Sequence, residues 1–102
     1  MGIARKTRAV VPPIPPPSIH PTAQGRRLRA LLKKYKWTGR ELARRTGLYE
    51  SDISKFCKGN KPIEGVQAYL IANVMGLTTD YILWGSVKGM PPEVVRDLPL
   101  ND

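Results

Sequence analysis

The spacing of apolar residues along the chain predicts a first helix at about residues 23–35. Leu28, Leu31, Leu32 and Tyr35 recur at intervals of three and four residues, which places them on one face of a helix. Basic side chains, among them Arg27, fill the rest of this segment, and we expect them on the surface. Similar patterns predict four more helices, at about 39–46, 49–58, 63–75 and 79–84. The chain is therefore expected to be all-α.

The residues at the start and end of the second predicted helix support its boundaries. Thr38 and Glu41 have the spacing of a capping box, in which the hydroxyl caps one backbone amide and the carboxylate reaches back to another. Gly47 suits the left-handed position that follows a helix end. Two short helices joined by a glycine-containing turn form the helix-turn-helix arrangement.

The fourth predicted helix is apolar on almost every side. One face carries Ala68, Ile71, Ala72 and Met75, and the roughly opposite face carries Ile63, Val66, Leu70 and Val74. A helix with two apolar faces is normally buried on both. A small domain has few ways to achieve that, so we expect a second copy, another protein or the C-terminal tail to cover the second face.

The chain divides into three parts by composition. Residues 1–21 hold six of the ten prolines and form a Pro-rich basic arm that we expect to be disordered. Residues 22–85 form the helical domain, and residues 86–102 form a tail with a short helical turn. For the arm three interpretations remain open: DNA contact through Arg5, Lys6 and Arg8, a proline-rich ligand for another protein, or a tail without a role.

The charge of the chain is concentrated in its middle. The net charge is +9, and residues 25–62 carry twelve basic and three acidic side chains, whereas residues 63–102 are net negative. A basic block inside a helical domain indicates a polyanionic partner, most often nucleic acid.

Composition excludes several other classes of function. One Cys and one His leave no internal disulfide, no zinc site and no catalytic triad, so we expect neither an enzyme nor a cofactor or metal. No apolar run reaches the roughly 18 residues that a membrane span needs. We expect a soluble protein of the cytoplasm, associated with the nucleoid.

Residues 37–56 read W-T-G-R-E-L-A-R-R-T-G-L-Y-E-S-D-I-S-K-F, and residues 72–85 read A-N-V-M-G-L-T-T-D-Y-I-L-W-G. Both segments resemble the lambda-repressor-like, or Cro/CI-type (XRE), helix-turn-helix family. The resemblance covers about residues 25–85, or roughly 60% of the chain. It implies a five-helix bundle whose third helix lies in the major groove of double-stranded DNA.

The resemblance also assigns roles to individual residues. The positions that read bases match Tyr49, Glu50, Ser51, Ser54 and Lys55. The positions that hold phosphates match Thr38, Arg40, Arg44, Asn60 and Lys61. The chemistry agrees, because Lys donates to guanine O6 and N7, Glu accepts from cytosine N4, and Ser does either.

The chain departs from the family pattern at three places. Gly39 stands where many relatives have a Gln that binds a phosphate, and Tyr49 stands where most have a Ser or Thr N-cap. Leu32 and Cys57 occupy positions that form an Arg–Glu ion pair in many relatives. Both are apolar, so we expect packing to replace the ion pair without loss of the fold.

The sequence therefore predicts a sequence-specific transcriptional regulator, a homodimeric repressor of the phage or mobile-element kind. The residues expected on its dimer or partner surface are Val66, Leu70, Val74, Tyr81, Trp84, Val94 and Val95. The alternative is an antitoxin-type protein that binds a toxin with this surface and represses its own operon.

Overall fold

A computed structural model describes residues 20–98, and all regular structure in this part of the chain is helical. The helices are α1 (Pro21–Tyr35), α2 (Gly39–Thr46), α3 (Glu50–Lys58), α4 (Gly65–Met75), α5 (Thr79–Trp84) and α6 (Pro92–Val95). The all-helical prediction is confirmed. The basic N-terminal arm lies outside the described residues, apart from its last two positions, and Pro21 already belongs to α1.

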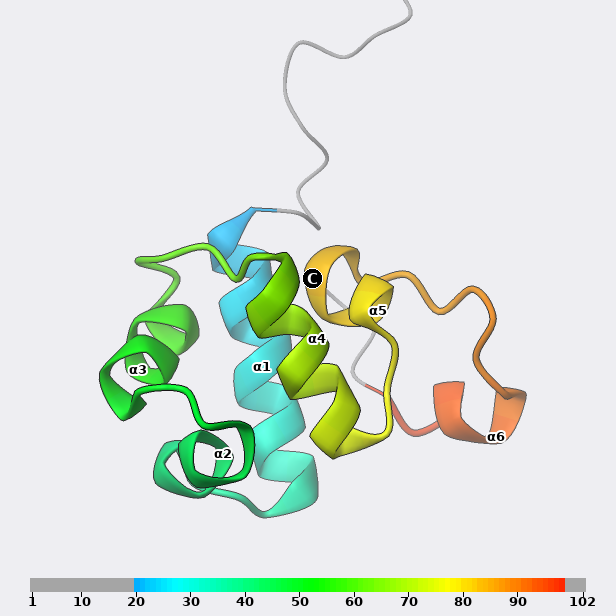
Figure 1. Ribbon diagram of the computed structural model, residues 1–102. Coiled ribbons are helices and arrows are strands. Elements are labelled where there is room, and N and C mark those ends of the chain that lie inside the picture. The colour runs from blue at the N-terminus through cyan, green and yellow to red at the C-terminus, as the bar shows by residue number, and fades with distance from the viewer. Residues whose placement is uncertain (1–19, 99–102) are drawn as a thin grey trace, which may run out of the picture.

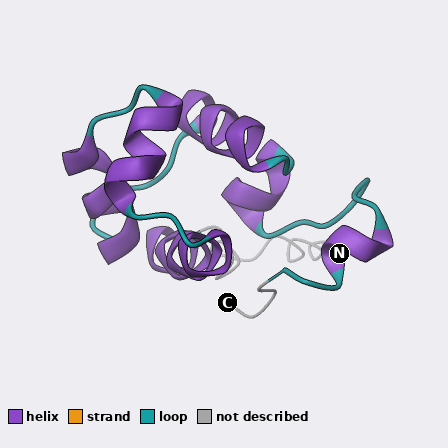
Figure 2. Cartoon of the chain, turned by 90° about the horizontal axis from the view of Figure 1, so that it is seen from below, coloured by secondary structure: helices purple, strands orange, loops and turns teal. Residues whose placement is uncertain are grey.

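Helix α1 is central to the bundle, as Figure 1 shows. It packs against α3 on one side and α5 on the other, while α2 contacts both α3 and α4, and α4 contacts α5. The short helix α6 lies apart from the α2–α3 pair, at the other end of the molecule (Figure 1). Figure 2 shows the helices and their connecting loops from below. The α3–α4 and α5–α6 loops are longer than the other three.

Side chains from every helix of the bundle meet in one hydrophobic core. Five of these side chains are at most 1% exposed: Leu28 and Leu31 of α1, Leu42 of α2, Phe56 of α3 and Ile71 of α4. The remaining buried apolar residues are Ala23, Leu32, Ala43, Ile53, Ile63, Ala68, Ala72, Met75, Tyr81, Ile82 and Leu98. The apolar stripe predicted for the first helix therefore does face the core.

Two polar side chains of α1 are buried with this core, which corrects the expectation that all the basic residues of α1 lie on the surface. Arg27 is only 2% exposed, and its guanidinium donates to the carbonyls of Ile82 and Leu83, at 3.2 and 3.0 Å. Gln24 accepts from the Ile63 amide at 2.9 Å and donates to the Leu83 carbonyl at 3.2 Å. These bonds satisfy buried backbone groups that α4 and α5 leave without helical partners.

Helix α4 begins at Gly65, two residues later than the pattern of apolar residues predicted. Ile63 is buried ahead of the helix, and the Glu64 amide donates to the Gln67 side chain at 3.0 Å. The second face of α4 is only partly covered: Val66 is 75% exposed, while Leu70 and Val74 are half-buried.

Tyr81 corrects the predicted partner surface. It was expected on that surface, but its side chain points from α5 into the core and is completely buried. Its neighbour Trp84 is 50% exposed, and Val94 and Val95 of α6 are half-buried. None of the described helices is long and apolar enough to cross a membrane.

Candidate nucleic-acid interface

The turn between α2 and α3 has the geometry expected from its residues. The Thr38 hydroxyl accepts from the Glu41 amide at 3.1 Å and so caps α2. Gly47 ends α2 at φ 81°, a left-handed conformation that glycine adopts without steric cost. Ile53 of α3 is buried against α2, where a Cβ on Gly39 would lie 3.4 Å from Cγ2 of Ile53. The two helices therefore form one packed unit.

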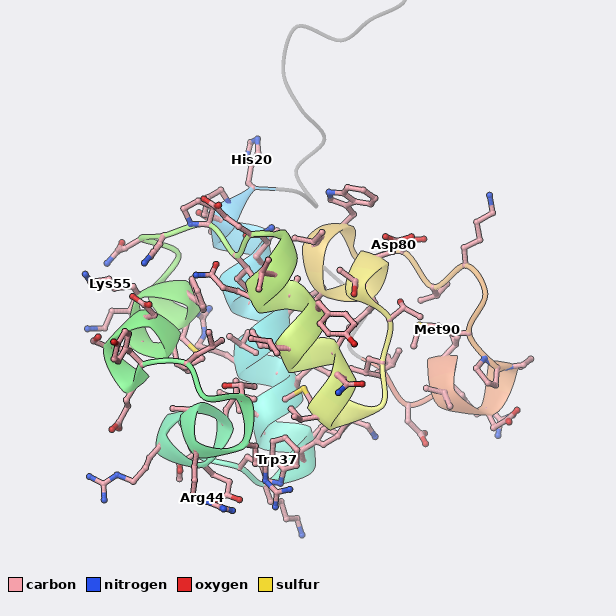
Figure 3. All side chains as sticks on the ribbon, viewed as in Figure 1. His20, Trp37, Arg44, Lys55, Asp80 and Met90 are labelled. Carbon is pink, nitrogen blue, oxygen red and sulfur yellow. The ribbon has the colours of Figure 1, made fainter. Side chains whose placement is uncertain are left out.

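Helix α3 presents a polar face to solvent. Ile53 and Phe56 point into the core. The five residues predicted to read bases are all exposed: Tyr49, Glu50, Ser51, Ser54 and Lys55. Figure 3 shows Lys55 on the side of α3 that faces away from α1. The structure thus brings the predicted base-reading side chains together at the N-terminus and outer face of one helix.

The residues predicted to hold phosphates border this face on two sides. Thr38, Arg40 and Arg44 belong to the N-terminal cap and the body of α2, and all three are exposed. Asn60 and Lys61 lie in the loop after α3, where the Asn60 amide donates to the Lys55 carbonyl at 3.0 Å. This bond holds the loop against the C-terminal end of α3.

Glu41 corrects one detail of the predicted capping box. The hydroxyl half of the box forms, but the Glu41 carboxylate binds two arginines of its own helix. Arg44 donates to both of its oxygens, at 3.2 and 2.5 Å, and Arg45 donates to Oε2 at 2.6 Å. The hydrogen bond from Arg44 lowers the pKa of Glu41 below its ordinary value of 4.5.

A cluster of aromatic residues braces the end of α1 and was not predicted from the sequence. The rings of Tyr35 and Trp37 meet edge to face at 5.3 Å, and the Arg45 guanidinium lies 4.2 Å from the centre of the Trp37 ring. The Tyr35 hydroxyl donates to the Met75 carbonyl at 2.6 Å, and burial raises the pKa of that hydroxyl. Two aromatic residues just before a helix cap, with an Arg eight residues after the second, were the signal in the sequence.

Packing accommodates one departure from the family pattern, the apolar pair Leu32 and Cys57. Leu32 is buried in the core, and the half-buried Cys57 packs against it, as expected from their apolar character. Burial raises the pKa of the Cys57 thiol. Arg29 of α1 donates to the Cys57 carbonyl and so binds the end of α3. Tyr49, at the N-cap of α3, makes no side-chain capping bond.

Three of the predicted DNA contacts lie outside the described residues, namely Arg5, Lys6 and Arg8. The site within residues 20–98 therefore consists of the exposed face of α3 and the polar residues of α2 and the α3–α4 loop.

Comparison with known proteins agrees with this geometry. The family model of the Cro/C1-type helix-turn-helix DNA-binding domain matches residues 27–78, from α1 to the N-cap of α5. Neither the curated proteins nor the solved structures contain a significant match. Because the family model covers half of the chain, including the whole α2–α3 unit, this protein belongs to the Cro/C1-type helix-turn-helix DNA-binding family.

Proposed function

We propose that this protein is a sequence-specific transcriptional regulator that reads the major groove of double-stranded DNA with α3. The observation that carries the proposal is the exposure of all five predicted base-reading residues on one helix whose other face is packed in the core. A rigid helix with a polar outer face at the surface of a basic unit is the arrangement that major-groove recognition requires.

The chemistry of the exposed side chains gives each a role. Lys55 donates to guanine O6 and N7, Glu50 accepts from cytosine N4, and Ser51 and Ser54 bind either kind of group. The Tyr49 ring, 77% exposed at the start of the helix, packs on a sugar or a thymine methyl.

The phosphate contacts set the position of α3 in the groove and supply the salt-dependent part of the affinity. We assign them to Thr38, Arg40, Arg44, Asn60 and Lys61. Gly39 offers no side chain to a phosphate, so Arg40 takes over the contact that a Gln makes in many relatives. Three of the five residues are cations, so each bound chain would contribute about −3 to the slope of log K against log salt.

We further propose that the protein is a homodimer that represses transcription by occupying its operator. Val66, Tyr69 and Trp84 are large apolar side chains that are at least half exposed, and they belong to α4 and α5 rather than to the α2–α3 unit. A two-fold pairing through this surface leaves both copies of α3 free, and it predicts half-sites about 34 Å apart. The antitoxin alternative uses the same surface and stays a prediction.

Selection of bound duplexes from a random DNA library, at about 150 mM salt, tests this proposal. We expect an inverted repeat to be enriched, with altered bases for Lys55→Ala and unaltered bases for the control Lys88→Ala, which lies in the α5–α6 loop. Binding without enrichment would contradict sequence-specific recognition. A protein that co-purifies from the native host and competes with self-association would favour the antitoxin alternative over the homodimer.

A further inference from the structure

Every carboxylate of the α2–α3 unit and its flanking loop lies against a cation. Three acidic residues occur between Thr38 and Lys61. The ion pairs are Glu41 with Arg44 and Arg45, Glu50 with Arg40, and Asp52 with Lys61. Arg40, Arg44 and Lys61 are also cations that we assign to DNA phosphates. The groups that would neutralise DNA are thus already bound to acids of their own chain.

Glu41 binds Arg44 in the way that a phosphate would. Nε and Nη2 of Arg44 donate to the two carboxylate oxygens, which is the two-pronged geometry that arginine uses for both carboxylates and phosphates. Arg45 occupies Oε2 of the same carboxylate, and its guanidinium is stacked on Trp37. Glu41 therefore holds two guanidinium groups at the surface of α2.

Asp52 of α3 forms an ion pair with Lys61 of the α3–α4 loop. The Lys61 ammonium lies 2.9 Å from Oδ1 of Asp52, although the residues are nine positions apart, and it is 6.0 Å from the centre of the Phe56 ring. Both side chains are partly buried. The third pair, Arg40 with Glu50, is looser at 3.7 Å and largely exposed.

The Glu41 and Asp52 pairs affect the phosphate contacts selectively, whereas the looser Arg40 pair also involves Glu50, a proposed base reader. A cation held by an acid gains little from a phosphate unless it leaves the acid, and the acid then faces the negatively charged backbone. The proposed base reader Lys55, by contrast, is exposed, and no ion pair involves it within residues 20–98. The internal competition therefore falls on the contacts that carry no sequence information.

We propose that Glu41 and Asp52 are affinity-setting residues that compete with DNA phosphates for Arg44 and Lys61. Binding to any duplex exchanges an internal carboxylate for a phosphate at each of the two cations. The acids lower the affinity for all DNA and make its salt dependence shallower than the number of cations suggests. This inference rests on the proposed function, because it requires that Arg44 and Lys61 contact DNA.

The test compares the full chain with its Glu41→Gln and Asp52→Asn variants on a labelled duplex of mixed sequence, from about 50 to 200 mM salt. We expect each variant to bind about two- to fivefold more tightly, because DNA binding would no longer have to break an exposed ion pair of that typical strength. The slope of log K against log salt should steepen by up to about 0.9 for each cation released.

The matched control is Glu93→Gln, which makes the same change in net charge on the exposed surface of α6, away from α2 and α3. A gain equal to that of Glu93→Gln would overturn the inference, since it would reflect net charge alone. A loss of affinity would also overturn it, because it would show that the acids position the cations for DNA. In an Arg44→Gln background, the gain from Glu41→Gln should disappear.

Two further measurements separate the possible failures. Circular dichroism melts identify any variant that fails to fold, and the Glu41 and Asp52 pairs test the inference independently of each other. Absence of duplex binding by the unmodified chain at about 50 mM salt would overturn the proposed function, and the inference with it. Binding by the unmodified chain with no difference among the three charge variants would overturn the inference alone.

Discussion

Gly25 of α1 lies directly against the carbonyl of Phe56 in α3. A Cβ on Gly25 would fall 2.6 Å from the Phe56 oxygen and 2.9 Å from the Cys57 oxygen, both of them backbone atoms. The two helices therefore touch backbone to backbone, and this contact sets how close α3 lies to the centre of the bundle.

Gly25→Ala is expected to destabilise the protein by about 1–3 kcal/mol, because a methyl group there forces α3 away from α1. Thermal or urea unfolding measures the change. Gly65→Ala is the matched control: nothing lies within 4 Å of a Cβ at that position, so its stability should be unchanged or slightly higher. Equal effects of the two substitutions would contradict the close contact.

Gln24 should contribute to stability through both ends of its amide. In Gln24→Leu the Ile63 amide loses its acceptor, which we expect to cost about 1–3 kcal/mol. Gln24→Glu retains the acceptor but cannot donate to the Leu83 carbonyl when it is ionised. The Gln24→Glu variant should therefore also be less stable than the unmodified chain at neutral pH. It should recover part of this stability at low pH, where the protonated carboxyl can donate again. Unfolding at two pH values distinguishes these contributions.

Arg40→Ala and Lys55→Ala should weaken DNA binding in different ways. Loss of a phosphate contact lowers the affinity for all sequences and reduces the salt slope by about 0.9. Loss of a base contact costs about 1–3 kcal/mol on the preferred site and relaxes the preference at one base pair. Titrations of the selected operator and its single-base variants, at several salt concentrations, measure both effects. The same pattern for both variants would contradict the assigned roles.

The Glu41 ion pairs should make the stability of the fold depend on pH in the acidic range. The pKa of Glu41 is lowered in the folded state, so its contribution is complete above the ordinary value of 4.5 and is lost as the pH falls through the lower, folded-state value. The melting temperatures of the unmodified chain and of Glu41→Gln should therefore converge below about pH 4.5. A difference that stays constant through this range would argue against the ion pairs.

Trp84→Ser should weaken self-association if α4 and α5 form the dimer surface. Truncation of a central aromatic residue commonly costs more than 1 kcal/mol at an interface, so we expect the dissociation constant to rise by about fivefold or more. Sedimentation velocity over a range of concentrations measures it. Tyr49→Ser removes another exposed aromatic ring, but from the surface proposed to face DNA, and should leave the association unchanged. A monomer at all concentrations would rule out the dimer.

Local sequence rules determined most of the helical framework. The helix-turn-helix boundaries follow from Thr38 and Gly47, which act through their own backbone and its nearest neighbours. The exposed face of α3 follows from helical periodicity, because burial of Ile53 and Phe56 leaves Ser51, Ser54 and Lys55 outside. These features required no knowledge of distant parts of the chain.

Contacts between distant residues were decided only by the tertiary structure. Arg27 has the character of a surface residue, and it is buried because α5 brings the carbonyls of Ile82 and Leu83 to its guanidinium. Tyr81 of the same helix is also buried, although it was expected on the partner surface. Burial of a polar group depends on whether a partner from elsewhere in the chain reaches it, and local patterns contain no information about that partner.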